Sequence, residues 1–414
     1  MTRFVFKAGL HLFFCLYSCL SQTTGRLTLP DAIALAHQNN PDVLRAQKEI
    51  DAAEGRILQA GRIPNPELGI AWNESPKVFG FGKATERDIS LSQQIEFPTK
   101  RSNRIDVASL DKELAELQLE RAKLFAAARV KQSYYTVLLS EKTLDGLERQ
   151  LRLLKDLQQV LAGRYQAGAS NYLDVVRAKV EITRINNDIA DARREYRVRQ
   201  NQLNITIGRN AEASLVLADS LSRINETFAR DSLFDTLIRN SLTLKIAQRS
   251  VSRQQQSLLL ARTNYLPDFE IAVANQRRAE VNNLWGVEFK MSLPLWFWQE
   301  PKGQVLEATA LTDIASATQT AVERKVRASI LNALDLLRVA ETQLKSFDES
   351  LLRDSKDILS TAITLYQNNQ IDVLNLLDVY RTHRATQVEY LRALYNRSVA
   401  EAELEAAAEL PTED

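Results

Sequence analysis

Cysteine, histidine and methionine are scarce in this chain of 414 residues. It has two cysteines, Cys15 and Cys19, which both lie near the N-terminus, and three histidines. The remainder of the sequence therefore offers no disulfide framework and no thiol nucleophile. Beyond the N-terminal segment, His37, His383 and Met291 are widely separated, so the sequence contains no cluster with metal-ligand spacing. We expect no metal site and no cofactor.

Charge of either sign is not in excess, and proline is confined to a few regions. Lys and Arg number 53 and Asp and Glu 52, which gives a net charge of +1. The chain therefore has no basic excess that would attract nucleic acid. All ten prolines lie within 30–98, within 267–301 or at position 411. The two long stretches without proline, 99–266 and 302–410, predict very long helices, because proline breaks a helix.

The N-terminus has the pattern of an export signal. A short basic region precedes an apolar segment at 8–20, and small and polar residues follow it. A membrane-spanning helix needs about 20 apolar residues, so we expect residues 1–21 to be a cleaved signal peptide. Residues 16–19 partly resemble a lipobox, which would make Cys19 a lipidated first residue; ordinary cleavage nearer Ser21 is the alternative.

A displacement of 201 residues superimposes the second half of the sequence on the first. The matched pairs include Asn39 with Asn240, Pro66 with Pro267, Tyr165 with Tyr366 and Leu173 with Leu374. The expected order of elements repeats as well, which indicates an internal duplication. We expect a first repeat at 22–210 and a second at 225–410, each with a helix, two strands and a long helical hairpin.

Four segments alternate apolar and polar residues, which predicts strands with one apolar and one polar face. They lie at about 66–75, 88–97, 268–276 and 287–297. The alternation suits strands between lipid and an aqueous lumen, and it also suits a half-buried soluble sheet. Trp296, Phe297 and Trp298 close the fourth segment. They resemble an aromatic belt at a bilayer interface, with a hydrophobic plug as the alternative.

Two helical hairpins follow the strand pairs, at about 100–207 and 302–408. Leucine and other apolar residues recur there at three-four spacing, so one face of each helix must pack against neighbours. An arm of some 65 residues spans about 100 Å, far more than a compact domain needs. Four strands in one chain leave two unpaired edges, which lipid does not tolerate. Residence in a membrane would therefore require several copies to pool their strands in a β-barrel.

The turns of both hairpins carry related motifs. The first has Arg164-Tyr165-Gln166-Ala167-Gly168 before Leu173-Asp174-Val175, and a degenerate copy occupies 365–374. With the duplication, these segments resemble the bacterial outer-membrane efflux protein (TolC) family from residue 27 to about 408. The resemblance implies a mainly α fold: a homotrimer with four strands per protomer in a 12-stranded β-barrel, surrounded by outer-membrane lipid, and an α-helical tunnel through the periplasm. It implies a passive duct without catalytic residues, served by a periplasmic adaptor and an inner-membrane pump of the RND type.

The resemblance also implies roles for single residues. Tyr366 matches a gating tyrosine, Asp174 its acidic partner and Asp378 one position of an aspartate ring that narrows the pore. The second ring position is Asn375, and Ile371 stands where the family has a gating arginine, so the gate is expected to have fewer charged contacts. The positions at the helical tips where the adaptor would dock are Arg164, Tyr165, Gly168 and Asn369.

One further segment indicates a branch of this family. Residues 92–97, Ser-Gln-Gln-Ile-Glu-Phe, followed by Lys100 and Arg101, resemble the heavy-metal efflux (CzcC/CusC-like) group. Metal cations are thus a predicted cargo, and drug efflux and type I secretion use the same kind of duct. A soluble periplasmic coiled-coil scaffold is the alternative from another class. No nucleotide-binding loop or nucleophile elbow is present, so an enzyme is not expected.

Overall fold

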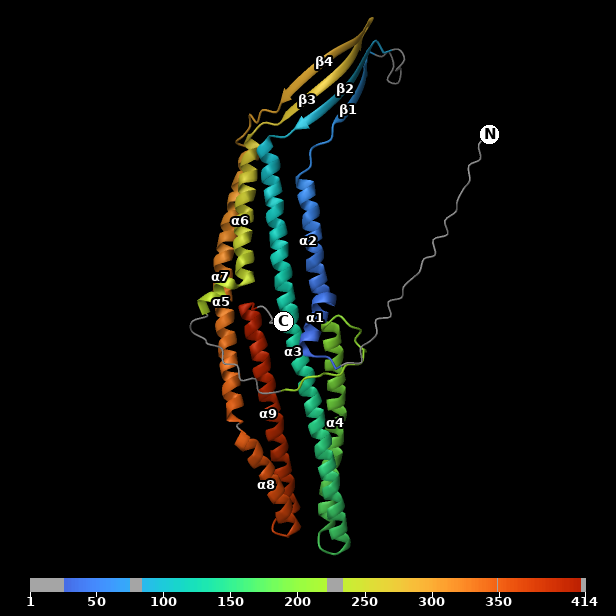
Figure 1. Ribbon diagram of the computed structural model, residues 1–414, viewed down its shortest axis with the longest axis vertical. Coiled ribbons are helices and arrows are strands. Elements are labelled where there is room, and N and C mark those ends of the chain that lie inside the picture. Colours follow the sequence, from blue (N-terminus) through green and yellow to red (C-terminus); the bar gives the residue numbers. More distant parts are fainter. Residues whose placement is uncertain (1–25, 75–83, 222–233, 348, 411–414) are drawn as a thin grey trace, which may run out of the picture.

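Long helices and one small sheet make up the computed structural model, which describes residues 26–74, 84–221, 234–347 and 349–410. The sheet lies at one end of an elongated molecule and the turns of two helical hairpins lie at the other (Figure 1). The expected signal peptide and Cys19 fall outside the described residues. Within these ranges, no helix combines the length and the apolar character needed to cross a membrane.

The first half of the chain begins with helices α1 (Leu29–Asn39) and α2 (Pro41–Ala60) and strands β1 (Glu67–Asn73) and β2 (Glu86–Ile95). Helix α3 (Pro98–Gln166) then runs for 69 residues, about 100 Å, and α4 (Tyr172–Thr206) returns along it. Helices α1 and α2 are separate because Asn40 caps α2, accepting a 2.9 Å hydrogen bond from the Asp42 amide, and Pro41 cannot continue α1.

The second half repeats this order of elements. It comprises helices α5 (Phe234–Asn240) and α6 (Leu242–Arg262), the short 3₁₀ helix η2 (Thr263–Tyr265), strands β3 (Phe269–Arg278) and β4 (Val281–Met291), and helices α7 (Glu300–Ser346), α8 (Glu349–Gln367) and α9 (Val373–Ala408). Helices α7 and α8 together correspond to α3. The predicted mainly α fold, with a duplicated order of helix, two strands and helical hairpin, is confirmed.

Two elements differ from the sequence prediction. Strand β4 begins at Val281 rather than at about 287 and ends at Met291, so Trp296, Phe297 and Trp298 lie in a turn after it. The reason is the tight β3–β4 turn, which fixes a register that pairs Met291 with Phe269, the first residue of β3. The first arm of the second hairpin, expected to be continuous, is interrupted at Phe347 (ψ 64°), whose ring packs against Tyr390 of α9.

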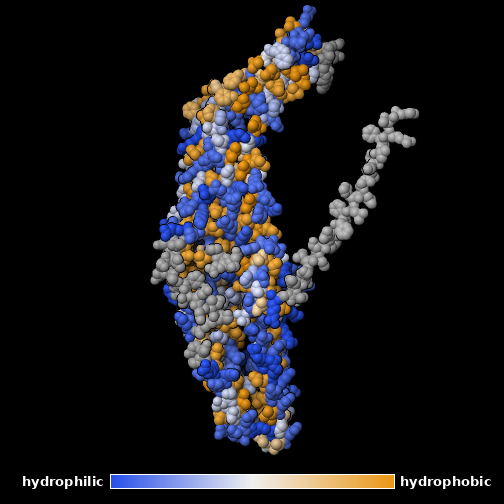
Figure 2. All heavy atoms as spheres, viewed as in Figure 1, coloured by the Kyte–Doolittle hydropathy of each residue, from blue (hydrophilic) through white to orange (hydrophobic). Residues whose placement is uncertain are grey.

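The four strands form an antiparallel sheet in the order β1-β2-β3-β4, which leaves β1 and β4 as its edges. One register row runs Leu68, Leu91, Val273 and Val287 across the strands, and all four side chains are exposed. The opposite face is polar and carries an ion pair between Glu86 and Arg278. Figure 2 shows hydrophobic residues gathered over the sheet and its junction with the helices, below a hydrophilic tip. None of the described residues covers the apolar face, whose side chains are exposed.

Helix α3 is the common neighbour of α1, α2, α4, α6 and α9. It packs against α2 and α6 near the sheet and against α4 and α9 in the other half. Near its middle, the fully buried Tyr134 places its hydroxyl 2.6 Å from a carboxylate oxygen of Asp219 and 2.8 Å from the carbonyl of Leu27. A buried hydroxyl requires a partner, so these two contacts hold the segments around Leu27 and Asp219 against α3.

Candidate functional site

The two hairpin turns have the same backbone geometry. Gly168 after α3 has φ 72° and Asn369 after α8 has φ 57°, and the two positions are equivalent in the duplication. In each turn the residue with positive φ and the next residue donate backbone hydrogen bonds to the last turn of the preceding helix. This is a left-handed C-terminal cap, in which glycine and asparagine are favoured. The two turns therefore end helices α3 and α8 in the same way.

Arg164 of α3 joins the first hairpin to the second at these tips. Its guanidinium lies 5.1 Å from the centroid of the Tyr366 ring. One Nη1–H donates to the carbonyl oxygen of Tyr366 at 3.1 Å, and Nη2 contacts the side-chain oxygen of Asn369. These acceptors end helix α8, where the helix dipole also favours a cation. The structure thus brings an arginine to Tyr366, where the sequence predicted Asp174 as its partner.

Asp174 lies nearby but bonds elsewhere. Its carboxylate is 3.5 Å from the guanidinium of Arg177, one turn further along α4. Asp174 and Asn375 line the same hollow of about 430 Å³ as Arg164, Tyr366 and Asn369. Burial raises the pKa of Tyr366 above its ordinary value, and the charge of Asp174 acts in the same direction while Arg164 lowers it. Five residues predicted from the sequence, Arg164, Asp174, Tyr366, Asn369 and Asn375, therefore line one hollow.

Asp378 does not line this hollow. It is exposed on α9, one helical turn beyond Asn375. Ile371, at the position of the expected arginine, packs instead against the apolar core shared by both hairpins. Leu154, Ile185 and Leu376 of that core are completely buried, and they come from α3, α4 and α9. The two hairpins of one chain are thus joined mainly by apolar packing, with polar contacts at its margin.

Two ion pairs between α4 and α9 were not predicted from the sequence. Arg381 donates to both carboxylate oxygens of Glu181, at 3.3 and 2.8 Å, and Arg384 donates to Asp188 at 2.8 Å. The Glu181 side chain is 10% exposed. The hydrogen bond from Arg381 lowers the pKa of Glu181 below its ordinary value, although burial opposes this shift. The sequence shows that Arg381 and Arg384 share one face of α9, and that Glu181 and Asp188 share one face of α4. Which of these residues pair depends on how the two helices align.

Aromatic side chains are exposed at both ends of the molecule. At the first tip, the rings of Tyr165 and Tyr172 are 5.5 Å apart, and the two residues are 46% and 60% exposed. Between the sheet and α7, Trp296, Phe297 and Trp298 are each more than half exposed. Exposed aromatic groups of this size suit contact with a partner or with the interfacial layer of a membrane.

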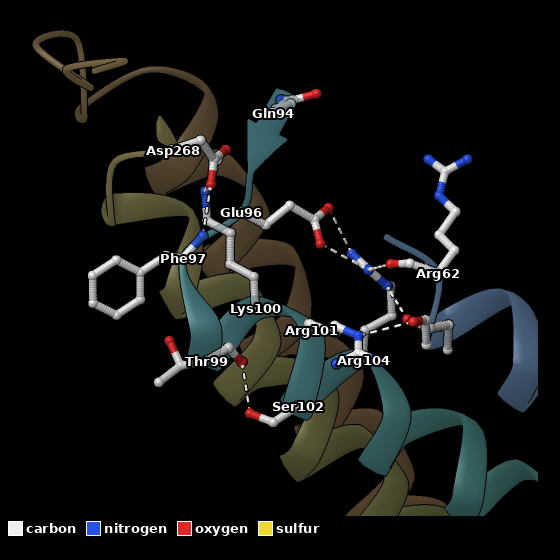
Figure 3. A network of polar contacts seen from close by, with 12 residues as sticks. Arg62, Gln94, Glu96, Phe97, Thr99, Lys100, Arg101, Ser102, Arg104 and Asp268 are labelled. Carbon is white, nitrogen blue, oxygen red and sulfur yellow. Dashed lines mark hydrogen bonds and ion pairs between the residues drawn. The ribbon is translucent and has the colours of Figure 1, made fainter. Parts of the chain in front are cut away.

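The segment at 92–101 that resembles the heavy-metal branch lies where the sheet meets the helices (Figure 3). Lys100 forms a 2.9 Å ion pair with Asp268, which also accepts a hydrogen bond from the Phe97 amide. Glu96 pairs with Arg104 at 2.8 Å, and Arg104 donates to the carbonyl of Ala60 at the end of α2. The charged motif residues therefore tie α2, β2, α3 and the start of β3 together.

Metal-ligating side chains are dispersed in the described ranges. No group of three or more His, Cys, Asp or Glu residues there could hold a metal ion. His383 Nδ1 lies 2.8 Å from the Ser355 hydroxyl, and burial lowers the pKa of its imidazole below the ordinary value. His37 Nε2 lies 3.2 Å from the carbonyl of Lys123. Each histidine has neighbours from the packing of adjacent helices.

A duplicated chain of four strands and two long hairpins defines a class of channel protein. The family model described as outer membrane efflux protein matches residues 32–209. The cobalt-zinc-cadmium resistance protein CzcC of Cupriavidus metallidurans is 24% identical over 375 residues, covering 90% of this chain and 88% of CzcC. Among solved structures, CusC has a TM-score of 0.77 at 18% identity (92% of this chain, 91% of CusC). VceC of Vibrio cholerae has 0.75 at 16% (92% and 95%).

The chain matches the outer membrane efflux protein family over residues 32–209, and it resembles CzcC over 90% of its length. It is an outer-membrane efflux channel that extends into the periplasm. The turn motifs, the duplication and the strand pairs from which the family was inferred are all present in the structure.

Proposed function

We propose that three copies of this chain form one duct. The edges β1 and β4 of the sheet pair with no further strand among the described residues, and three times four strands would close a ring without edges. Helix α7, at the margin of the helical layer, exposes Leu306, Ile314 and Val339 by 53–61%. A neighbouring copy would cover these side chains, and about 25 cal/mol is gained per Å² of apolar surface buried.

We infer that the hairpin tips receive cargo from a periplasmic adaptor and an inner-membrane pump. The tips lie at the end of the molecule opposite the sheet (Figure 1), which makes them the entrance if the sheet lies in the outer membrane. The exposed pair Tyr165 and Tyr172 and the turn residues Gly168 and Asn369 provide the contact surface for the adaptor. The duct needs no chemistry of its own, because the pump supplies the energy.

We infer further that Arg164 is the principal polar restraint of a gate at these tips. The observation that supports this role is its contact with the ring and carbonyl of Tyr366, which joins the two hairpins of one chain. Asp174 and Asn375 line the same hollow, and Asp174, which is half-buried, would become more exposed when the hairpins separate. Ile371 stands where the resemblance implies a gating arginine, and in this proposal Arg164 of the opposite hairpin takes that role.

Arg164→Ala is expected to increase conductance of the reconstituted trimer in planar bilayers. Loss of the cation–π contact and the hydrogen bonds to α8 removes about 1–3 kcal/mol, which corresponds to roughly a tenfold larger open fraction. Arg152→Ala is the matched control, because Arg152 is exposed on the same helix and no ion pair links it to another described residue. Equal conductance of the two variants would contradict the role of Arg164.

Asp378→Ala is expected to weaken the cation preference of the open channel. In a trimer, three exposed Asp378 carboxylates on α9 would face a common axis and attract cations. The measurement is the reversal potential in a salt gradient, with Asp357→Ala on the exposed surface of α8 as the control. An unchanged reversal potential would remove Asp378 from the constriction, while the channel assignment would stand.

We propose heavy-metal cations as the exported cargo. Support comes from the name of CzcC, which matches over 90% of this chain, and from the branch motif at 92–101. Cells that lack the gene should become more sensitive to cobalt, zinc and cadmium, and a plasmid copy should restore resistance. Unchanged metal tolerance, with sensitivity to drugs or failure to secrete a protein instead, would replace metal by one of these cargoes.

A further inference from the structure

Two arginines interrupt the apolar face of the sheet at the end remote from the helices. Arg87 of β2 pairs in register with Arg277 of β3, and Trp72 of β1 pairs with Arg87. Because side chains alternate along a strand, Arg87 lies on the same face as Ile89 and Leu91. Both arginines are exposed. The row that they form is the last one on this face; the row of Glu86 and Arg278, on the opposite face, follows it.

Neither guanidinium has a partner in the described part of the chain. No hydrogen bond or ion pair joins Arg87 or Arg277 to another described residue. Arg278, next in sequence but on the opposite face, differs: it binds both carboxylate oxygens of Glu86, at 2.9 and 3.0 Å. Like charges directly opposite each other destabilise a sheet. The pair on the apolar face therefore favours an anion other than the described carboxylates of the chain.

The position of the pair indicates which anion. From Phe269 to Val273 the β3 residues of this face are apolar, and the face continues through Asn275 to Arg277. These eight steps span about 27 Å along the strand, or about 20 Å at the usual tilt, close to the ~25 Å apolar band of membrane strands. Trp296 lies beyond one end of this band, and Trp72 and the two arginines lie at the other. The arginines thus occupy the level of lipid headgroups.

We propose that Arg87 and Arg277 together bind the phosphate of a lipid headgroup in the outer leaflet. The proposal rests on the proposed function, in which the apolar face contacts lipid and the helices extend into the periplasm. Two guanidinium groups offer planar pairs of N–H donors that match phosphate oxygens. A free phosphate ion would use these donors alone. A lipid would also place acyl chains on Ile89 and Leu91, next along the same face, and this continuity favours lipid.

The experiment is native mass spectrometry of the full-length trimer in detergent. Lipid A carrying its two phosphomonoesters is compared with dephosphorylated lipid A, and inorganic phosphate is added as a competitor. The variant is Arg87→Gln with Arg277→Gln. The matched control is Arg278→Gln, which removes a guanidinium one residue away on the opposite face. All three proteins are also tested for conductance in planar bilayers.

Wild-type protein and the Arg278→Gln control should bind phosphorylated lipid A roughly tenfold more tightly than the dephosphorylated form, and the double variant should lose this difference. Retention of the difference by the double variant, or its absence in wild type, would overturn the proposal. The proposal would also be overturned if micromolar inorganic phosphate displaced phosphorylated lipid A from the wild type, because the site would then bind a free anion. Conductance by all three proteins would keep the channel whatever the lipid result, whereas a wild type that never inserts would refute the proposed function itself.

Discussion

Gly208→Ala is expected to destabilise the middle of the molecule by about 3 kcal/mol or more, whereas Gly168→Ala is expected to cost about 1 kcal/mol. Both glycines have positive φ, 75° and 72°, so both alanines would be strained. Their surroundings differ. A Cβ on Gly208 would lie 2.5 Å from Cβ and 2.6 Å from the carbonyl oxygen of Asn39, but a Cβ on Gly168 would meet nothing within 4 Å.

The cost at Gly208 is large because the clash involves backbone that is itself fixed. Asn39 ends α1, and the neighbouring Asn40 both caps α2 and donates a 3.0 Å hydrogen bond to the carbonyl of Thr206 at the end of α4. Relief of the overlap would move at least one of these helix ends. Urea unfolding followed by circular dichroism, at equal protein and detergent concentration, measures both variants. Similar midpoints would show that close approach to Asn39 is not what requires glycine.

Glu181→Gln is expected to loosen the two hairpins and to increase conductance at neutral pH several-fold. The substitution keeps the shape of a side chain that is 10% exposed, but it leaves Arg381 facing a neutral amide. Because Arg381 is itself half exposed, solvent limits the cost to about 1–2 kcal/mol. Glu195→Gln is the matched control: Glu195 pairs with Arg199 within the same helix α4 and with no other described helix.

The same residue predicts a pH dependence. Arg381 lowers the pKa of Glu181 in the folded protein, so the ion pair stabilises the joined hairpins at all pH values above the ordinary glutamate pKa, about 4.3. This stabilisation is lost as the pH falls through the lowered value. Wild-type conductance should therefore rise only in strong acid, and the Glu181→Gln channel should lack this step. A step of equal size in both channels would assign the acid response to other carboxylates.

Local sequence patterns determined the types of element and their order. Period-two alternation identified the four strand segments, and the absence of proline from 99–266 and 302–410 identified the long hairpins. Gly168 was expected at a turn and has the left-handed conformation that a helix C-terminal cap requires. These properties depend on the spacing of residues within one element, so they can be read without knowledge of the other elements.

Contacts between elements required the tertiary structure. The sequence placed Arg164, Tyr366 and Asp174 at the tips. It did not show that Arg164 would bind Tyr366. The pairing of Glu181 with Arg381, that of Arg87 with Arg277, and the early end of β4 likewise depend on the alignment of helices and on strand register. Shifting one strand by a single residue moves every side chain to the other face. Many residues at once set such alignments, and for that reason a local pattern does not contain them.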